Sequence, residues 1–216
     1  MSKAQPVLIA GTWRDSKSVG SFEPDNPRTR QSTGETYPVS GLEEVEEAVE
    51  AAATASEQLQ AHYPEGVARF LEVFADRIEA CRDEIVEMAA TETGYPASPR
   101  LNDIELPRTT DQIRQAAAAA RHRAWSMATI DSASGVRSMF AALEGGVAVF
   151  GPNNFPLAFN SIAGGDFAAA IAAGCPVIAK ANSSHPGTTR LLAEEAFAAL
   201  ADAGLPPATV QLIYRT

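Results

Sequence analysis

The sequence has few residues that could build a metal centre or a disulfide framework. It contains only two cysteines and three histidines among 216 residues. Cys81 and Cys175 form no Cys-x-x-Cys pair, and the histidines do not cluster. A structural zinc site needs about four ligands of these types in a recognisable spacing. We therefore expect no metal site, and we expect both thiols to be buried and inert.

The sequence also lacks a long hydrophobic run. A membrane-spanning helix needs about 20 consecutive, mainly apolar residues, and no stretch of that length occurs. The apolar part of the N-terminus, MSKAQPVLIAGTWRD, is too short for a secretory signal. We expect a cytoplasmic protein with no membrane contact.

Positive charge is scarce in the first half of the chain. The formal net charge is −10, and residues 1–108 hold 20 acidic and 10 basic side chains. Residues 109–216 hold 7 of each. An acidic surface repels nucleic-acid phosphates, so we expect no nucleic-acid partner. The neutral second half is where an anionic cofactor could approach.

The glycine-rich turn G-x-G-x-x-G, which usually marks a dinucleotide site, is absent as well. What is present is a different crossover unit. The apolar run Val147–Phe150 leads into the turn Gly151–Pro156, and a helix pattern follows from Leu157 to Ala173. A second β-branched run, from Pro176, ends at Lys180. Strand, turn, helix and strand in this order are typical of a parallel sheet.

The end of the chain repeats this pattern. A helix is expected from Pro186 to Ala203, followed by a third apolar run, Val210–Tyr214. We predict an α/β fold: the first half of a doubly wound, Rossmann-like parallel sheet, preceded by an N-terminal arm and helices. Because the third strand would then have a bare edge, we expect the chain to be truncated.

The residues before this unit predict strands and helices. Strands are expected at Val7–Trp13 and Val19–Phe22, and Ser40 with Glu43 forms a capping-box pattern for the next helix. Further helices are expected from Leu42 to Ala61, from Pro64 to Ile78, from Asp83 to Thr93 and from Thr109 to Trp125, with Pro96, Pro99 and Pro107 breaking the stretch between the last two. A β-ribbon is expected between Ser126 and Leu143.

Two side chains at the ends of the expected strands could carry chemistry. Asn154 offers an amide donor that could stabilise an oxyanion. Alternatively, Asn153 or Asn154 caps the following helix. Lys180 could reach a ribose or a phosphate, or could be an ordinary surface lysine. The helix that starts near His185 offers its N-terminus to an anion.

The stretch from Val149 to Thr189 resembles the aldehyde dehydrogenase superfamily. The similarity lies in Asn154-Phe155-Pro156, in Ala172-Ala173-Gly174-Cys175-Pro176-Val177, in Lys180 and in His185-Pro186-Gly187-Thr188. The segments GPNNFPLAFN and GGDFAAAIAAG are most similar to the family branch that contains the 2-oxoglutarate semialdehyde (2,5-dioxopentanoate) and fatty-aldehyde dehydrogenases. The commoner family form has Trp where this chain has Asn153.

The resemblance implies roles for individual residues. Asn154 matches the asparagine that donates to the oxyanion, and Lys180 matches the lysine that holds the adenosine ribose. Ser183 stands where the family often has a glutamate that repels a 2′-phosphate, so NADP or NAD is implied, with NADP favoured. The remaining candidates for cofactor binding are Phe150, Gly151, Pro152, Asn153, Asn182 and Arg215.

The resemblance also implies a domain division and partners. Residues 1–125 would form the N-terminal arm and the helical part of the cofactor-binding domain. Residues 126–144 would form an oligomerisation ribbon, and 145–216 the first βαβαβ half of the nucleotide-binding sheet. The expected partners are a small-molecule aldehyde and further copies of the chain, in a dimer or tetramer.

The family's nucleophilic cysteine and general-base glutamate have no match in these residues, so the catalytic domain is expected to be absent. We expect the 216 residues alone to be inactive. Two alternatives stay open. The chain could be a non-catalytic binding or assembly module that docks through the edge at Val210–Tyr214. It could also belong to a reductase of acyl thioesters or acyl phosphates with the same fold.

Overall fold

The computed structural model describes residues 3–216 and has a five-stranded sheet at its centre. The strand order is β2-β1-β11-β10-β9, with β9, β10 and β11 parallel. The bounds are β9 (Val147–Phe150), β10 (Val177–Lys180) and β11 (Val210–Ile213). The predicted α/β fold with its parallel half-sheet is thereby confirmed.

The N-terminal arm completes the sheet in a way that the sequence did not indicate. The expected single strand over Val7–Trp13 is wrong: β1 (Val7–Ile9) and β2 (Thr12–Arg14) form a hairpin, turning at Ala10 and Gly11, which both have positive φ. β1 pairs antiparallel with β11. The expected bare edge at Val210–Tyr214 is therefore covered, and the open edge of the parallel strands is β9.

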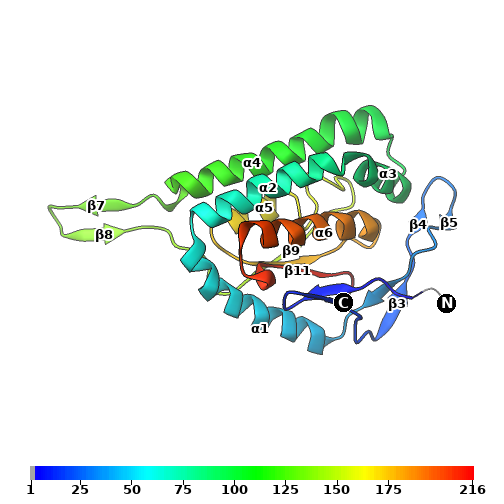
Figure 1. Cartoon of the computed structure of the whole chain (residues 1–216), viewed down its shortest axis with the longest axis horizontal. Helices are drawn as coiled ribbons and strands as arrows, with labels where there is room; N and C mark the ends of the chain where they lie inside the picture. Colours follow the sequence, from blue (N-terminus) through cyan, green and yellow to red (C-terminus); the bar gives the residue numbers. More distant parts are fainter. Residues whose placement is uncertain (1–2) are drawn as a thin grey trace.

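Helices cover both faces of the sheet (Figure 1). α1 (Leu42–Leu59) packs on one face, against β1 and β10. The crossover helices α5 (Gly165–Ala172) and α6 (Pro186–Ala203) pack on the other face. An outer layer follows, made of α2 (Glu65–Ala80), α3 (Arg82–Thr93) and α4 (Leu106–His122). Gly94 and Gly204 end α3 and α6 in the left-handed conformation, as helix C-caps often do.

The starts of two helices, α1 and α4, differ from the prediction. No side chain caps α1, whose N-cap is Gly41, so the predicted capping box does not form. Glu43 pairs with Lys17 instead. Of the prolines between α3 and α4, Pro96 lies in the break that follows α3, and the backbone kinks at Ser98, just before Pro99, inside η2 (Ala97–Glu105), as predicted. Pro107 does not break the chain: η2 continues into α4, where Pro107 lies in the first turn and needs no hydrogen-bonded N–H.

The predicted helix from Leu157 to Ala173 is helical only in its second half, as α5. The backbone N–H groups of Leu157 and Ala158 donate to the Glu105 carboxylate. The buried Asn160 side chain accepts from the N–H of Ile162 and donates to the carbonyl of Pro156. These local bonds compete with a helix.

A ribbon projects from the body of the molecule (Figure 1). It consists of β7 (Thr129–Asp131) and β8 (Val136–Ser138), and all six residues are exposed. It exposes large hydrophobic side chains to an unusual extent: Ile130, Val136, Met139, Phe140 and Leu143. The remaining short elements are β3 (Gly20–Phe22), β4 (Asp25–Asn26), β5 (Gln31–Ser32), β6 (Tyr37–Val39), η1 (Gln60–His62), η3 (Ala124–Ser126) and η4 (Pro207–Thr209).

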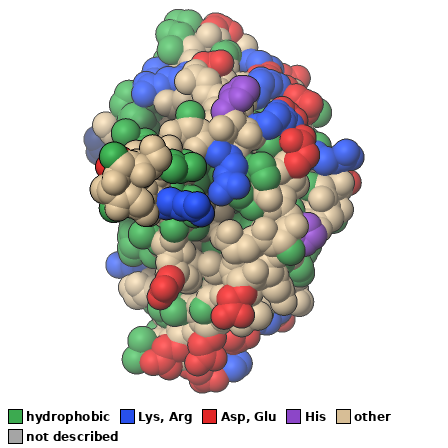
Figure 2. Space-filling view, turned by 90° about the vertical axis from the view of Figure 1, so that its left-hand side faces the viewer, with side chains coloured by type: hydrophobic (Ala, Val, Ile, Leu, Met, Phe, Trp, Pro, Cys, Tyr) green, Lys and Arg blue, Asp and Glu red, His purple; other side chains and the backbone are tan. Residues whose placement is uncertain are grey.

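Three further features bear on function: the distribution of acidic side chains, the character of the helices and the state of the possible metal-binding side chains. Acidic side chains gather at the lower end of the molecule in Figure 2, the end at which α1 lies in Figure 1. Among residues 3–216, no helix combines the length and apolar character needed to cross a membrane. Nor do His, Cys, Asp and Glu side chains in that range form a group that could hold a metal ion. Cys175 is buried, Cys81 is half-buried, and both thiols are free.

Candidate active site

The carboxyl ends of the three parallel strands meet at one edge of the sheet. Lys180 at the end of β10 lies level with Phe150 on β9 and with Ile213 on β11. The residues that follow each strand therefore share this edge: Gly151 onward, Asn182 onward and Arg215. Ligands of open α/β sheets bind at such an edge. The fold thus brings the sequence-predicted residues together.

The turn after β9 is held against the rest of the protein through its backbone. A Cβ on Gly151 would lie 2.9 Å from the backbone nitrogen of Ser161, so only glycine allows this approach. The side-chain amide of Asn182 donates to the Gly151 carbonyl over 3.0 Å. Nε2 of the buried His185 lies 3.0 Å from the Pro152 carbonyl. Asn182 and His185 thus orient the turn.

His185 is neutral in this arrangement. Burial lowers the pKa of its imidazole, more than the hydrogen bond to Pro152 raises it. A carbonyl oxygen can only accept, so Nε2 carries the proton. His185 therefore packs against the turn and holds the Pro152 carbonyl.

Asn154 lies at the tip of this turn, and its side chain is exposed. Its carboxamide makes no hydrogen bond to another residue of the range 3–216. Neither Asn153 nor Asn154 caps a helix, since α5 begins at Gly165 with Gly164 as N-cap and without a side-chain cap. The capping alternative is therefore wrong, and the amide of Asn154 is available to a ligand.

Two cations face the edge of the sheet. Lys180 is half-buried and donates no hydrogen bond within the described range. Burial, followed by the charge of Arg215, lowers the pKa of its ammonium group. Arg215 is exposed, with its guanidinium 5.7 Å from the centre of the Phe22 ring. An anion at this edge would offset the repulsion between the two side chains.

A cavity of ≈ 460 Å³ joins three of the predicted cofactor-binding residues: Asn153, Ser183 and Arg215 line it. Three acidic side chains line it as well: Glu23 and Asp25 of the N-terminal arm, and Glu92. Lys180 is not part of the lining, although its ammonium group lies close enough to Arg215 for the two charges to interact.

The predicted anion site at the N-terminus of α6 is already filled by a side chain of the protein. The buried carboxylate of Glu92 on α3 accepts from the backbone N–H of Gly187 over 2.7 Å and of Thr188 over 2.8 Å. It also accepts from the Thr188 hydroxyl. This helix end is therefore not open to an external anion. The sequence contains one sign of this role: Glu92 lies on the same face of α3 as the buried Ala89, where an acidic residue needs a partner.

Burial raises the pKa of Glu92 to about 7, although the hydrogen bonds from Thr188 and Gly187 act in the opposite direction. The carboxyl group consequently changes its charge near neutral pH while it remains inside the protein.

A second group that the sequence did not reveal lies on the other side of the Asn154 turn. Arg108 on α4 places its guanidinium 5.7 Å from the centre of the Phe155 ring and 5.0 Å from that of Phe159. Arg108 is exposed and pairs with no carboxylate among residues 3–216. Arg100 and Glu105, from η2, also contact this turn.

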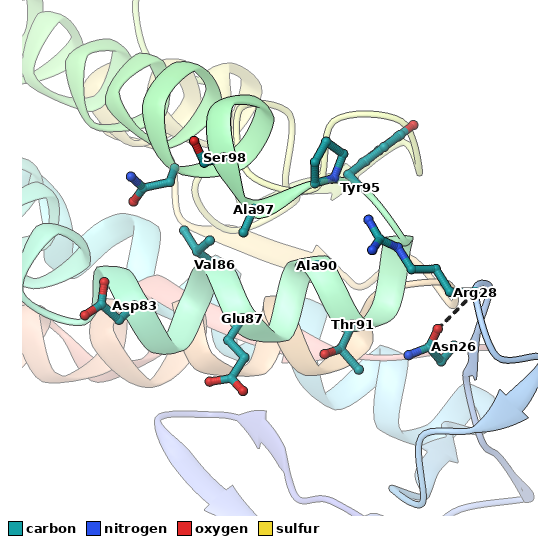
Figure 3. Close-up of a pocket in the computed structure, with 12 residues that line it drawn as sticks. Asn26, Arg28, Asp83, Val86, Glu87, Ala90, Thr91, Tyr95, Ala97 and Ser98 are labelled. Carbon is teal, nitrogen blue, oxygen red and sulfur yellow. Dashed lines mark hydrogen bonds between the residues drawn. The ribbon is translucent and has the colours of Figure 1, made fainter.

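A cavity of ≈ 720 Å³ lies apart from these residues (Figure 3). It is enclosed by α3, the start of η2 and the arm around Arg28, whose backbone N–H donates to the Asn26 side chain. None of the predicted site residues lines it. The candidate site is therefore the edge of the sheet.

Known proteins share both the sequence and the fold. A family model described as "Aldehyde dehydrogenase family" matches residues 13–216. The chain is 40% identical over 219 residues to alpha-ketoglutaric semialdehyde dehydrogenase 2 of Azospirillum brasilense, covering 95% of this chain and 40% of that protein. It is 37% identical over 222 residues to alpha-ketoglutaric semialdehyde dehydrogenase of Acinetobacter baylyi, covering 99% and 42%.

A solved structure with the same fold is a mutant of aldehyde dehydrogenase C from Pseudomonas syringae, in complex with NAD+ and octanal. It has a TM-score of 0.83 at 25% identity, over 99% of this chain and 41% of that one. The chain spans about two fifths of the length of the curated relatives it matches. Since the family model covers nearly all of its residues, the chain belongs to the aldehyde dehydrogenase family.

Proposed function

We propose that this chain is the cofactor-binding part of an enzyme that oxidises an aldehyde to its carboxylic acid with NADP or NAD. The observation that carries the proposal is the free carboxamide of Asn154 at the end of β9, on the same sheet edge as Lys180 and Arg215. This edge offers an oxyanion donor and a pair of cations in one place.

In the proposed reaction, Asn154 acts on the aldehyde oxygen. When a nucleophile adds to the carbonyl carbon, negative charge develops on that oxygen, and the Nδ2–H of Asn154 donates to it. The nucleophile would have to come from elsewhere than these 216 residues. Cys175 is buried, and burial raises the pKa of both thiols, of Cys81 and of Cys175, which disfavours the reactive thiolate.

The cofactor, when bound, supplies the hydride acceptor. Its adenosine part fits the sheet edge because Lys180 and Arg215 are cations and because Ser183 brings no carboxylate. A 2′-phosphate carries charge of the opposite sign to both side chains. We therefore propose NADP as the preferred cofactor, bound along Phe150 to Asn153, Asn182 and Ser183.

Replacing Ser183 with glutamate is expected to shift the preference from NADP towards NAD. A carboxylate within about 4 Å of a phosphate repels it by a few kcal/mol at an effective dielectric constant of about 20. The ratio of kcat/KM for NADP to that for NAD should fall about 10-fold or more. Ser183→Gln is the matched control, because it adds the same bulk without the charge. Equal ratios in both variants would place Ser183 away from the 2′ position.

We propose 2-oxoglutarate semialdehyde as the substrate. Two relatives bear that activity in their names. This aldehyde also carries a carboxylate, and Arg108 is an exposed cation beside the Asn154 turn without a carboxylate partner in residues 3–216. A guanidinium is well suited to hold a carboxylate.

The test is NADPH formation by the full-length protein with 2-oxoglutarate semialdehyde and with octanal, an uncharged aldehyde. Arg108→Ala is expected to lower kcat/KM for the semialdehyde about 10-fold to 100-fold, since a hydrogen bond between charged groups contributes about 1.5–3 kcal/mol. Octanal should be affected much less. Arg114→Ala, which removes an arginine on the same helix that pairs with Asp76, is the control. If no aldehyde is oxidised, the chain is better described as a binding module or as part of a reductase.

We propose further that the β7–β8 ribbon binds a second copy of the chain. Its exposed apolar side chains, among them Ile130 and Phe140, would be buried in a dimer or tetramer. An assembly through β11, the surface of the binding-module alternative, is not favoured because β1 covers that strand.

The free thiols are in keeping with the predicted cytoplasmic location.

A further inference from the structure

We propose that Glu105 and Arg100 are positioning residues for Asn154, and that they hold the turn in the geometry in which the Asn154 amide meets the substrate oxygen. The inference deepens the proposed function and depends on it. Among residues 3–216, neither residue forms a hydrogen bond with the side chain of Asn154, so we assign their effect on the reaction to the backbone of the turn.

Glu105 binds the residues that follow Asn154. It is fully buried, and its Oε1 accepts from the backbone N–H of Leu157 over 2.8 Å and of Ala158 over 3.0 Å. These two residues follow the Asn-Phe-Pro turn and, as shown above, are not helical. The carboxylate satisfies these two buried N–H groups and thereby fixes the backbone that follows Asn154.

Arg100 binds Asn154 itself. One guanidinium nitrogen, Nη2, donates to the Asn154 carbonyl oxygen over 3.0 Å. The guanidinium lies 4.5 Å from the centre of the Phe155 ring and 5.2 Å from that of Tyr95. Such stacking restricts both the arginine and the aromatic ring next to Asn154.

The two residues act as one unit because they form an ion pair. Arg100 Nη1 lies 3.1 Å from the second carboxylate oxygen of Glu105, whose side chain is 0% exposed. The pair thus neutralises a buried charge, and it links the N–H groups of Leu157 and Ala158 to the carbonyl of Asn154. A change at Glu105 would release Arg100 as well.

The rest of the turn is held from the opposite side. Asn182 binds the carbonyl of Gly151, and His185 binds that of Pro152. The backbone is thus fixed on both sides of Asn154, whereas its carboxamide is left unbonded within the described range. This is the arrangement expected of a donor whose direction matters, since a misplacement of about 1 Å can cost about 10²-fold in rate.

The experiment is a double-mutant cycle in the full-length enzyme, with Glu105→Gln, Asn154→Ala and the double variant. Glutamine keeps the size of the side chain but removes the charge that holds Arg100. We expect Glu105→Gln alone to lower kcat about 10-fold or more, with the KM for NADP nearly unchanged. In the Asn154→Ala background, the same change should lower kcat less than 2-fold, because there is no amide left to position.

A matched control separates positioning from general destabilisation. Glu195 on α6 pairs with Arg77 on α2, and neither side chain binds η2 or the Asn154 turn among residues 3–216, so Glu195→Gln disturbs an ion pair outside the turn. It should leave kcat unchanged. Where Glu105→Gln fails to fold, as judged by circular dichroism, Arg100→Gln is used in the same cycle, because it removes the bond to the Asn154 carbonyl and leaves Glu105 bound to Leu157 and Ala158.

The outcomes are distinct. If Asn154→Ala lowers kcat and the effect of Glu105→Gln is the same with and without Asn154, the positioning role is overturned while the proposed function stands. If Asn154→Ala leaves kcat at the wild-type value, the oxyanion role itself is wrong, and the positioning role falls with it. Loss of the Glu105 effect in the Asn154→Ala background supports the proposal.

Discussion

Replacing Asn154 with alanine is expected to lower kcat of the full-length enzyme by about 10²–10³-fold, the usual cost of removing one oxyanion donor. The amide of Asn154 is exposed and has no other hydrogen-bond partner in the described range, so its removal leaves no buried group unpaired. The loss should therefore appear in the rate of the chemical step and not in protein stability. Steady-state kinetics and a denaturant melt of the same variant measure both.

Asn153→Ala is the control for this variant. Asn153 is the neighbouring residue, also exposed, but it lines the cavity that contains Ser183 and Arg215. Its replacement should raise the KM for NADP and change kcat little. Wild-type values of both kcat and kcat/KM in Asn154→Ala would show that this residue does not stabilise the oxyanion.

Glu92→Ala is expected to give the largest loss of stability. The carboxyl group of Glu92 accepts hydrogen bonds from two backbone N–H groups and one hydroxyl at the start of α6, all of them buried. Unsatisfied buried donors cost about 1–3 kcal/mol each, so the free energy of unfolding should fall by roughly 2–4 kcal/mol at pH 5. A Cβ on Gly187 would lie 2.9 Å from Glu92 Oε1, which shows how closely the two segments approach.

The effect of Glu92 should depend on pH in a defined direction. Its pKa is about 7 in the folded protein, against an ordinary value of 4.5. The folded state therefore binds more protons than the unfolded state between these values, and the contribution of Glu92 to stability decreases as the pH rises from about 4.5 to about 7. The difference in stability between wild type and Glu92→Ala should be larger at pH 5 than at pH 8.

Urea denaturation at the two pH values measures this difference. Glu87→Ala is the matched control, because Glu87 is an exposed residue on the same helix, α3, and its loss should change the stability by less than about 0.5 kcal/mol at either pH. A pH-independent difference for Glu92→Ala would mean that the carboxyl group titrates in the same way in the folded and unfolded states.

Local patterns in the sequence predicted the parallel strands and α6 well. β9, β10 and β11 end within one residue of the positions expected from their apolar runs, and α6 begins at Pro186 and ends at Ala203 as predicted. Each of these elements is delimited by a turn, a proline or a glycine close by in the sequence. The position of Asn154 and Lys180 at the strand ends follows from the same patterns.

Local patterns failed where a side chain from a distant part of the sequence binds the backbone. Residues 157–164 have the composition of a helix, but Glu105 takes the N–H groups of Leu157 and Ala158, and the helix starts only at Gly165. The start of α6 was expected to be open to an anion, but Glu92 occupies it.

The sequence by itself determined the half-sheet, the family to which the chain belongs and the residue types at the strand ends, because periodicity and turn chemistry act over a few residues. Only the tertiary structure decided that β1 covers β11 and that Glu105 and Glu92 bind the two turns around the site. These carboxylates find their partners 52 and 95 residues away along the chain. Contacts at that separation depend on how helices pack on the sheet, and no short sequence pattern encodes them.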